Sequence, residues 1–177
     1  MTKIEFLQMV PGLLFGISLA EIALFLGKST KSGKQLYWEH LVLIAISFET
    51  IIFNWYIFYD RLSSLDTSYF NFLIQLLAPL ASFVYVANLL VENKDPEKPI
   101  SDYFLKNRKR IFISLAIFVI INVLTIAYFQ HNFQLGFLPV IPISVILLNA
   151  FFDLKWLRIF AYSVKCLQVI LVCIYIK

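Results

Sequence analysis

The sequence predicts an all-α fold, a polytopic bundle of transmembrane helices, from three observations. Hydrophobic residues make up 60% of the 177-residue chain and charged residues only 15%, whereas a soluble domain is about half apolar and about a quarter charged. The apolar residues form six continuous stretches, each long enough to cross a bilayer and each bounded by polar residues. Because lipid offers no hydrogen-bond partner to a backbone amide, such stretches must be helical.

Polar residues between the apolar stretches place the six spans at about residues 6–27, 38–59, 69–91, 111–128, 135–152 and 156–176. No linker or change of composition divides the chain, so we expect residues 1–177 to form one transmembrane domain. The fifth stretch is the shortest and contains Pro139 and Pro142. If these prolines make it a re-entrant segment, five spans remain.

Lys and Arg are distributed unequally between the two sides of this topology. The segments after spans one, three and five hold 11 of the 15 basic residues, and the opposite side holds 3. Because basic loops favour the cytoplasmic side, we expect a multi-pass protein of the cell membrane with both termini outside the cytoplasm. We therefore attribute the net charge of +4 to loop residues that set the orientation and contact lipid headgroups, and we expect no nucleic-acid partner.

Three ionisable residues lie well inside the predicted spans: Glu21 in the first, Glu49 in the second and Lys165 in the sixth. A charge at such a depth is unfavourable unless it is paired, neutralised or hydrated. Glu49 and Lys165 lie at similar depth near the middle of the membrane, so an ion pair between them is the simplest explanation, with Glu21 as a second candidate partner. The pair would serve either as a static packing element or as a titratable or ion-binding site.

A second candidate feature is a polar face on the second span, formed by His40, Ser47, Thr50 and Asn54. Their helical spacing places them together, roughly opposite Glu49. Spans three and four carry similar polar positions. Stripes of this kind either join helices through hydrogen bonds or line an aqueous path.

The first span carries a stripe of small residues on one face: Gly12, Gly16, Ala20, Ala23 and Gly27. Small side chains allow a neighbouring helix to approach closely. The stripe therefore predicts either packing within the chain or an interface between copies in a homo-oligomer.

Motifs for catalysis or for binding a metal or cofactor are absent from the sequence. Its two histidines, His40 and His131, fall at opposite ends of predicted spans, and Cys166 and Cys173 lie too far apart on one helix for a disulfide. The sequence has no zinc-protease motif and no phosphate-binding loop. We therefore expect no enzyme activity, no cofactor and no metal.

The N-terminal third has a Gly-rich first span, a basic loop, the sequence Tyr37-Trp38-Glu39-His40 at the start of span two and the sequence Asn54-Trp55-Tyr56 near its end. This pattern resembles a group of uncharacterised small bacterial multi-span membrane proteins. The resemblance implies a bacterial cytoplasmic membrane and no particular activity.

The leading functional prediction is a non-catalytic bundle whose polar interior passes, senses or binds a proton, an ion or a small polar solute. The alternative is a membrane anchor or accessory subunit that presents the charged loop, residues 92–110, to a cytoplasmic protein partner. An intramembrane enzyme is the third hypothesis.

Overall fold

The computed structural model describes residues 3–31, 37–62, 68–90, 100–130, 140–152, 156, 158–160, 162 and 163. In this part of the chain the regular elements are all α-helices, which confirms the predicted all-α class. They are α1 (Lys3–Lys31), α2 (Trp38–Leu62), α3 (Tyr69–Leu89), α4 (Ile100–Gln130) and α5 (Val140–Phe151).

The starts of α2 and α3 agree with the predicted spans to the residue, at Trp38 and Tyr69. Ser68 caps α3, because its hydroxyl accepts a hydrogen bond of 3.2 Å from the backbone N–H of Asn71. A serine in this position satisfies one of the N–H groups that have no acceptor in the first turn of a helix. The local sequence therefore determines where this helix begins.

The boundary of α4 differs from the prediction, which placed residues 92–110 in a loop and began the span at residue 111. The helix starts at Ile100, so the expectation of a loop is wrong for residues 100–110. Lys and Arg have good helix propensity, and charge alone does not end a helix. The segment is amphipathic: Phe104 is buried, whereas Lys106 and Arg110 are exposed.

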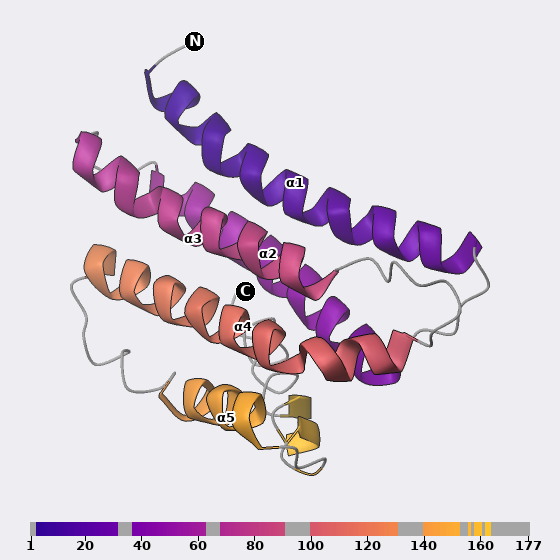
Figure 1. The fold of residues 1–177 in the computed structure, drawn as a ribbon. Helices are drawn as coiled ribbons and strands as arrows, with labels where there is room; N and C mark the ends of the chain where they lie inside the picture. The colour runs from indigo at the N-terminus through magenta and orange to yellow at the C-terminus, as the bar shows by residue number, and fades with distance from the viewer. Residues whose placement is uncertain are drawn as a thin grey trace.

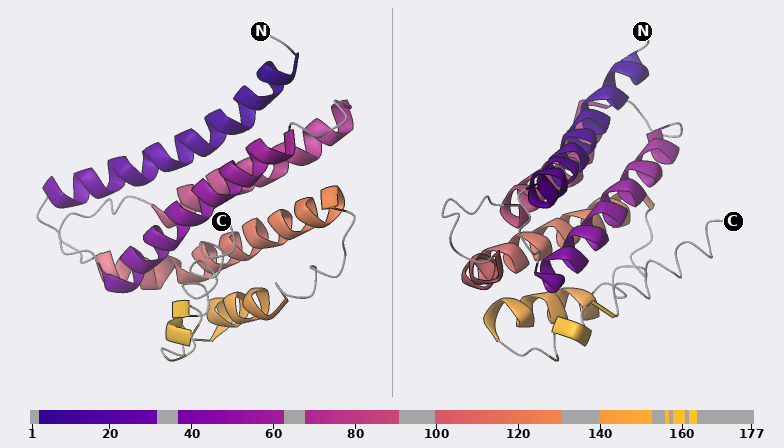
Figure 2. Two further views of the ribbon diagram at one scale, coloured as in Figure 1. Left: turned by 180° about the vertical axis from the view of Figure 1, so that it is seen from behind. Right: turned by 90° about the vertical axis from the view of Figure 1, so that its right-hand side faces the viewer.

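The first four helices run antiparallel in turn, as Figure 1 shows, so that the end of α1, the start of α2, the end of α3 and the start of α4 lie at one end of the bundle. Helices α1, α3, α4 and α5 lie one below another in this view, and α2 packs behind α3 (Figures 1 and 2). We name the shared end the basic end, because the exposed residues Lys28, Lys31, Lys106, Lys109 and Arg110 lie there.

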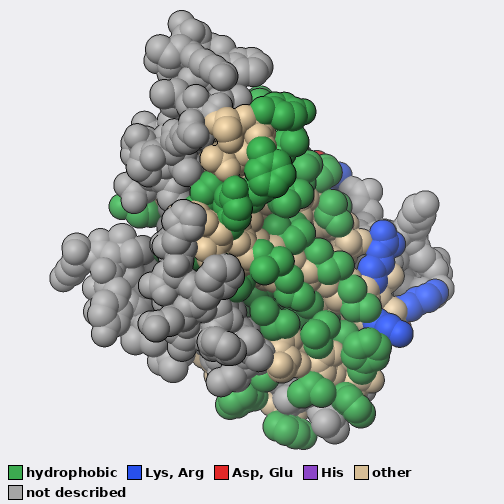
Figure 3. Space-filling view, turned by 90° about the vertical axis from the view of Figure 1, so that its left-hand side faces the viewer, with side chains coloured by type: hydrophobic (Ala, Val, Ile, Leu, Met, Phe, Trp, Pro, Cys, Tyr) green, Lys and Arg blue, Asp and Glu red, His purple; other side chains and the backbone are tan. Residues whose placement is uncertain are grey.

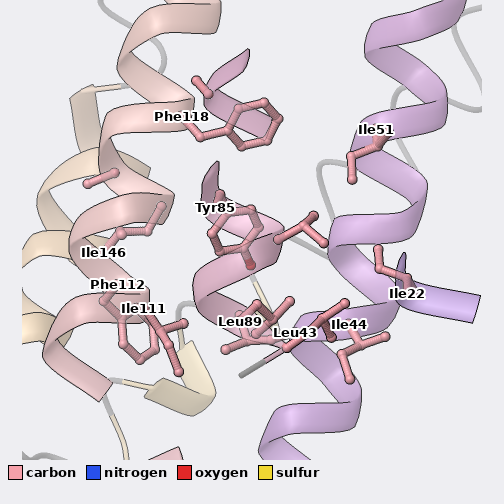
Figure 4. Close-up of a cluster of buried hydrophobic side chains, with 14 of the residues drawn as sticks. Ile22, Leu43, Ile44, Ile51, Tyr85, Leu89, Ile111, Phe112, Phe118 and Ile146 are labelled. Atoms are coloured by element: carbon pink, nitrogen blue, oxygen red, sulfur yellow. The ribbon is translucent and has the colours of Figure 1, made fainter. Parts of the chain in front are cut away.

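One hydrophobic core runs through the bundle and receives side chains from every helix. Ile22, Ile44, Tyr85, Phe118 and Ile146 belong to α1 through α5 in that order, and each is at most 8% exposed. Figure 4 shows these side chains converging between the helices. Tyr85 and Phe118 stack nearly parallel, with ring centroids 5.8 Å apart. The central helix α3 thus joins α2 to α4.

The outside of the bundle is also apolar. Leu13, Leu24 and Leu124 are each more than half exposed, and hydrophobic side chains cover much of the face in Figure 3, with Lys and Arg along one edge. Among the described residues, three helical segments are long and apolar enough to cross a membrane: Met9–Lys31, Tyr69–Leu89 and Phe104–Phe129. The chain is therefore a membrane-associated helical protein.

The fifth predicted span is described only from Val140 onwards. Helix α5 has 12 residues, a length of roughly 18 Å at 1.5 Å per residue, which is less than the hydrocarbon core of a bilayer. Pro142 lies in the first turn of α5, where a missing N–H breaks no helical hydrogen bond. Pro139 and the sixth predicted span beyond residue 163 lie outside the described residues.

Candidate functional site

A buried ion pair lies at the basic end, where α2 begins. Glu39 is 0% exposed and Arg158 is 5% exposed. The Nε of Arg158 donates to Oε2 of Glu39 over 2.7 Å, and Nη2 of Arg158 donates to Oε1 over 3.3 Å. This two-point contact between a guanidinium and a carboxylate is geometrically specific and stronger than a single neutral hydrogen bond. We call Glu39, Arg158 and the residues around them the Glu39 cluster.

Tyr37 supplies a third donor to the carboxylate. Its hydroxyl donates to Oε1 of Glu39 over 2.7 Å, and its ring lies 5.5 Å from that of Phe104 on α4. Burial raises the pKa of the Tyr37 phenol, and the hydrogen bond to the Glu39 carboxylate raises it further. Tyr37 therefore stays protonated at neutral pH and acts as a hydrogen-bond donor to Glu39.

Tyr162 extends the cluster on the Arg158 side. It follows Arg158 by four residues, a spacing that puts both side chains on one face of a helix. The ring centroids of Tyr162 and Trp38 lie 6.3 Å apart, with the ring planes nearly perpendicular. Tyr162 thus contacts Trp38, while Arg158 contacts the next residue of α2, Glu39. Tyr162 is 6% exposed, and its hydroxyl has no hydrogen-bond partner among the described residues.

His40 extends the cluster on the other side. Its Nε2 lies 2.9 Å from the carbonyl oxygen of Leu89 on α3, and its ring contacts Phe25 and Phe104. A carbonyl only accepts, so Nε2 carries the proton in this hydrogen bond, and Nδ1 of the neutral ring is an acceptor. His40 is 3% exposed, yet Nδ1 has no partner among the described residues.

The other members of the predicted polar face of α2 also point into the bundle. Ser47 is 2% exposed, bonds the carbonyl of Leu43 and lies 2.8 Å from the hydroxyl of Tyr85 on α3. Asn54 donates to the backbone carbonyl of Thr50 over 2.8 Å. The Thr50 hydroxyl is buried and has no partner in the described part of the chain. His40 and Ser47 thus connect α2 to α3.

Polar side chains of α3 and α4 mostly bond the backbone of their own helix. Ser82 donates to the carbonyl of Pro79, Ser114 to that of Ile111 and Asn122 to that of Phe118. A side chain that bonds within its own helix does not need water. This pattern favours local satisfaction over a continuous aqueous path through these helices.

The predicted midplane charges are only partly described. Glu49 lies on α2, is half-buried and has an interaction partner. Lys165, its predicted partner, lies outside the described residues, as do His131, Cys166 and Cys173. Glu21 is exposed on α1. The described residues contain no group of three or more His, Cys, Asp and Glu that could hold a metal ion.

The small-residue stripe of α1 is covered only at its start. A Cβ placed on Gly12 would lie 3.6 Å from the indole nitrogen of Trp55, an ordinary contact distance, whereas a Cβ on Gly16 or Gly27 would meet nothing within 4 Å. Ala20 and Ala23 are exposed. Most of the stripe therefore faces away from the described part of the chain.

The Glu39 cluster was not predicted from the sequence. Neither Glu39 nor Arg158 was among the candidate site residues predicted from the sequence. A signal was present nevertheless: both residues stand near the start of an even-numbered predicted span, which places them at the same side of the membrane. The chain matches no protein-family model, no curated protein and no solved structure.

Proposed function

We propose that the chain is a non-catalytic, six-span membrane bundle that binds a proton, an ion or a small polar solute in its interior, and that the Glu39 cluster controls access from the basic end. In this proposal the basic end faces the cytoplasm and both termini lie outside it. Glu49 and Lys165 form the midplane site, roughly 15 Å further along α2 at 1.5 Å per residue.

The observation that carries this proposal is the incomplete hydrogen bonding around a fully buried carboxylate. Arg158 and Tyr37 bind Glu39, yet beside them the acceptor Nδ1 of His40 and the hydroxyl of Tyr162 have no partner among the described residues. Buried polar atoms are satisfied in the great majority of cases. A water molecule or a small polar ligand bound at each atom would satisfy it.

The ion pair itself also supports a functional role. Two buried charges rarely stabilise a fold more than apolar residues of similar size would, because both must be desolvated. Charged groups inside a membrane protein commonly mark a pathway or a switch. An ion pair that blocks access by direct contact can separate when one partner is neutralised or binds a ligand instead.

Hydrogen bonds within α3 and α4 limit the kind of polar interior that the bundle can have. The side chains of Ser82, Ser114 and Asn122 donate their hydrogen bonds to backbone carbonyls of their own helices. They are therefore poorly suited to line a wide, water-filled channel. These hydrogen bonds favour a site for one proton or one small solute over an open pore.

Proton flux into proteoliposomes tests this proposal. Vesicles containing a pH-sensitive dye should equilibrate an imposed pH gradient faster with the wild-type protein than without protein. Glu39→Gln and Glu49→Gln should each change this rate, and Asp102→Asn, which neutralises an exposed acid of α4, should not. Infrared difference spectra between two pH values provide a second readout, because a titrating carboxyl group gives its own band. Wild-type protein that shows neither flux nor a titrating carboxyl would contradict the proposal for protons.

The alternative is a membrane anchor or accessory subunit that presents residues 92–110 to a protein partner. The helical form of residues 100–110 supports it, because a rigid, exposed helix is a suitable surface for docking. In that case the Glu39–Arg158 pair only fastens the bundle. The double variant Glu39→Gln/Arg158→Met would then remain folded and would retain every activity of the wild type.

A further inference from the structure

The first turns of α4 carry a cluster of cations on one face. Lys106, Lys109 and Arg110 are all exposed, and their spacing of three and four residues places them side by side on the helix. Arg108 is half-buried and has its own partner, so it does not belong to this face. We name Lys106, Lys109 and Arg110 the basic face of α4.

Exposed apolar side chains border the basic face. Leu105 is 43% exposed on the same helix, and Phe151 and Phe152 at the end of α5 are 61% and 55% exposed. The ammonium group of Lys109 lies 5.1 Å from the centre of the Phe151 ring, so cations and apolar groups adjoin where α4 meets α5. The basic face lies in the first two turns of the apolar segment Phe104–Phe129.

We propose that the basic face of α4 binds the phosphate headgroup of an anionic phospholipid. Lys106, Lys109 and Arg110 would contact the phosphate, and Arg110 can do so through two parallel N–H groups. Leu105, Phe151 and Phe152 would contact the upper part of the acyl chains. A free phosphate ion would make no contact with these apolar neighbours. An acidic protein surface would leave them exposed to water.

The position of the face relative to the membrane supports a lipid as its ligand. The basic face lies at one end of the candidate span Phe104–Phe129, and basic residues at the cytoplasmic end of a span are drawn to the anionic headgroups of that leaflet. The exposed acid Asp102 lies on the same side of the helix, but the three cations outnumber it. This inference does not depend on the Glu39 cluster or on the proposed solute site.

The test compares lipid retention by two variants of equal charge. The full-length protein is placed in nanodiscs of phosphatidylcholine and phosphatidylglycerol, and the lipids that stay bound are measured by native mass spectrometry. The wild type should retain phosphatidylglycerol in excess over its share of the bilayer. Lys106→Gln/Lys109→Gln should lower this preference about thirtyfold, since each lysine near the surface contributes about 1 kcal/mol. The control Lys28→Gln/Lys31→Gln removes two exposed cations from α1 at the same end and should keep the preference.

Equal retention by wild type and Lys106→Gln/Lys109→Gln would overturn the proposal, and so would an equal loss in the α1 control, which would indicate diffuse attraction. Glutamine suits a helix, so circular dichroism in pure phosphatidylcholine should show both variants folded. Lys106→Arg/Lys109→Arg keeps the charge and should keep the preference, even if the Gln variant is unstable. Inorganic phosphate added to phosphatidylcholine discs should not raise the melting temperature. If phosphate raised the melting temperature and no lipid preference were found, the basic face of α4 would bind a soluble anion, and the proposed lipid site would be refuted.

Discussion

Arg158 donates to Glu39 over 2.7 Å although 119 residues separate the two in the sequence. Glu39 lies in the first turn of α2, and Arg158 follows α5, so the contact joins the start of the second helix to the segment after the fifth. Both side chains are almost fully removed from solvent, at 0% and 7% exposure. Loss of either charge would therefore break a two-point contact that is shielded from solvent.

The first prediction follows from this contact. Glu39→Gln or Arg158→Met alone should lower the free energy of unfolding by about 3–5 kcal/mol, because each removes one charge of a buried ion pair and keeps the other. The double variant should recover most of this loss. Urea or thermal unfolding in detergent, followed by circular dichroism, measures both effects. Asp102→Asn should change stability by less than about 0.5 kcal/mol, since its side chain is exposed. Additive losses in the double variant would show that the pair is not an energetic unit.

The second prediction concerns the midplane charges. Glu49→Gln and Lys165→Met should be coupled by about 1–3 kcal/mol if the two side chains are in contact. The double variant should then be folded. If the pair binds the transported or sensed species, that variant should also be inactive in the proteoliposome assay. Independent effects of the two single variants would mean that Glu49 has a different partner, and the midplane pair would have to be abandoned.

The third prediction separates the two interpretations of the α1 stripe. Gly16 has open space around it, so Gly16→Leu should leave the stability of the monomer unchanged. If the stripe joins two copies of the chain, the same change should dissociate the oligomer, because a larger side chain prevents close approach. Cross-linking in native membranes measures the oligomeric state. Ile17→Phe enlarges an exposed side chain about 100° from the centre of the stripe, and it should have no effect. An unchanged cross-link in Gly16→Leu would exclude the stripe as an interface.

The fourth prediction concerns orientation. Reporter fusions within residues 92–99 should report the cytoplasm, and fusions after residue 177 should report the opposite side, because basic segments remain in the cytoplasm. A cytoplasmic C-terminus would remove the sixth crossing and favour a re-entrant fifth segment.

Much of the helical framework could be predicted because it depends on local sequence. Apolar runs between polar residues placed the starts of α2 and α3 correctly, and Ser68 marks the second of these positions. The start of α4 could not be found in this way. Lys106 and Arg110 resemble loop residues in composition, but as helical residues they point to the exterior while Phe104 and Ile111 enter the core.

The Glu39 cluster depends on tertiary structure, and that explains why the sequence did not reveal it. Residue type does not show whether an acidic side chain is buried or exposed. The functional prediction was therefore made for Glu49, which lies nearer the middle of the span. Glu39 is buried where it contacts Arg158, a residue far away in the sequence that only the fold brings to α2. His40, by contrast, was placed on the correct polar face by helical spacing, and its neighbours Leu89 and Phe104 became known only from the fold.

Helix α4 contains 31 residues and neither proline nor glycine, whereas α1 and α3 contain Pro11 and Pro79. Its length is roughly 46 Å at 1.5 Å per residue, more than the hydrocarbon thickness of about 30 Å. A helix longer than the bilayer is thick adapts to a thinner bilayer by tilting. Because α4 packs between α3 and α5 (Figure 1), such a tilt would move both neighbours, so membrane thickness would influence the spacing of helices deep inside the protein.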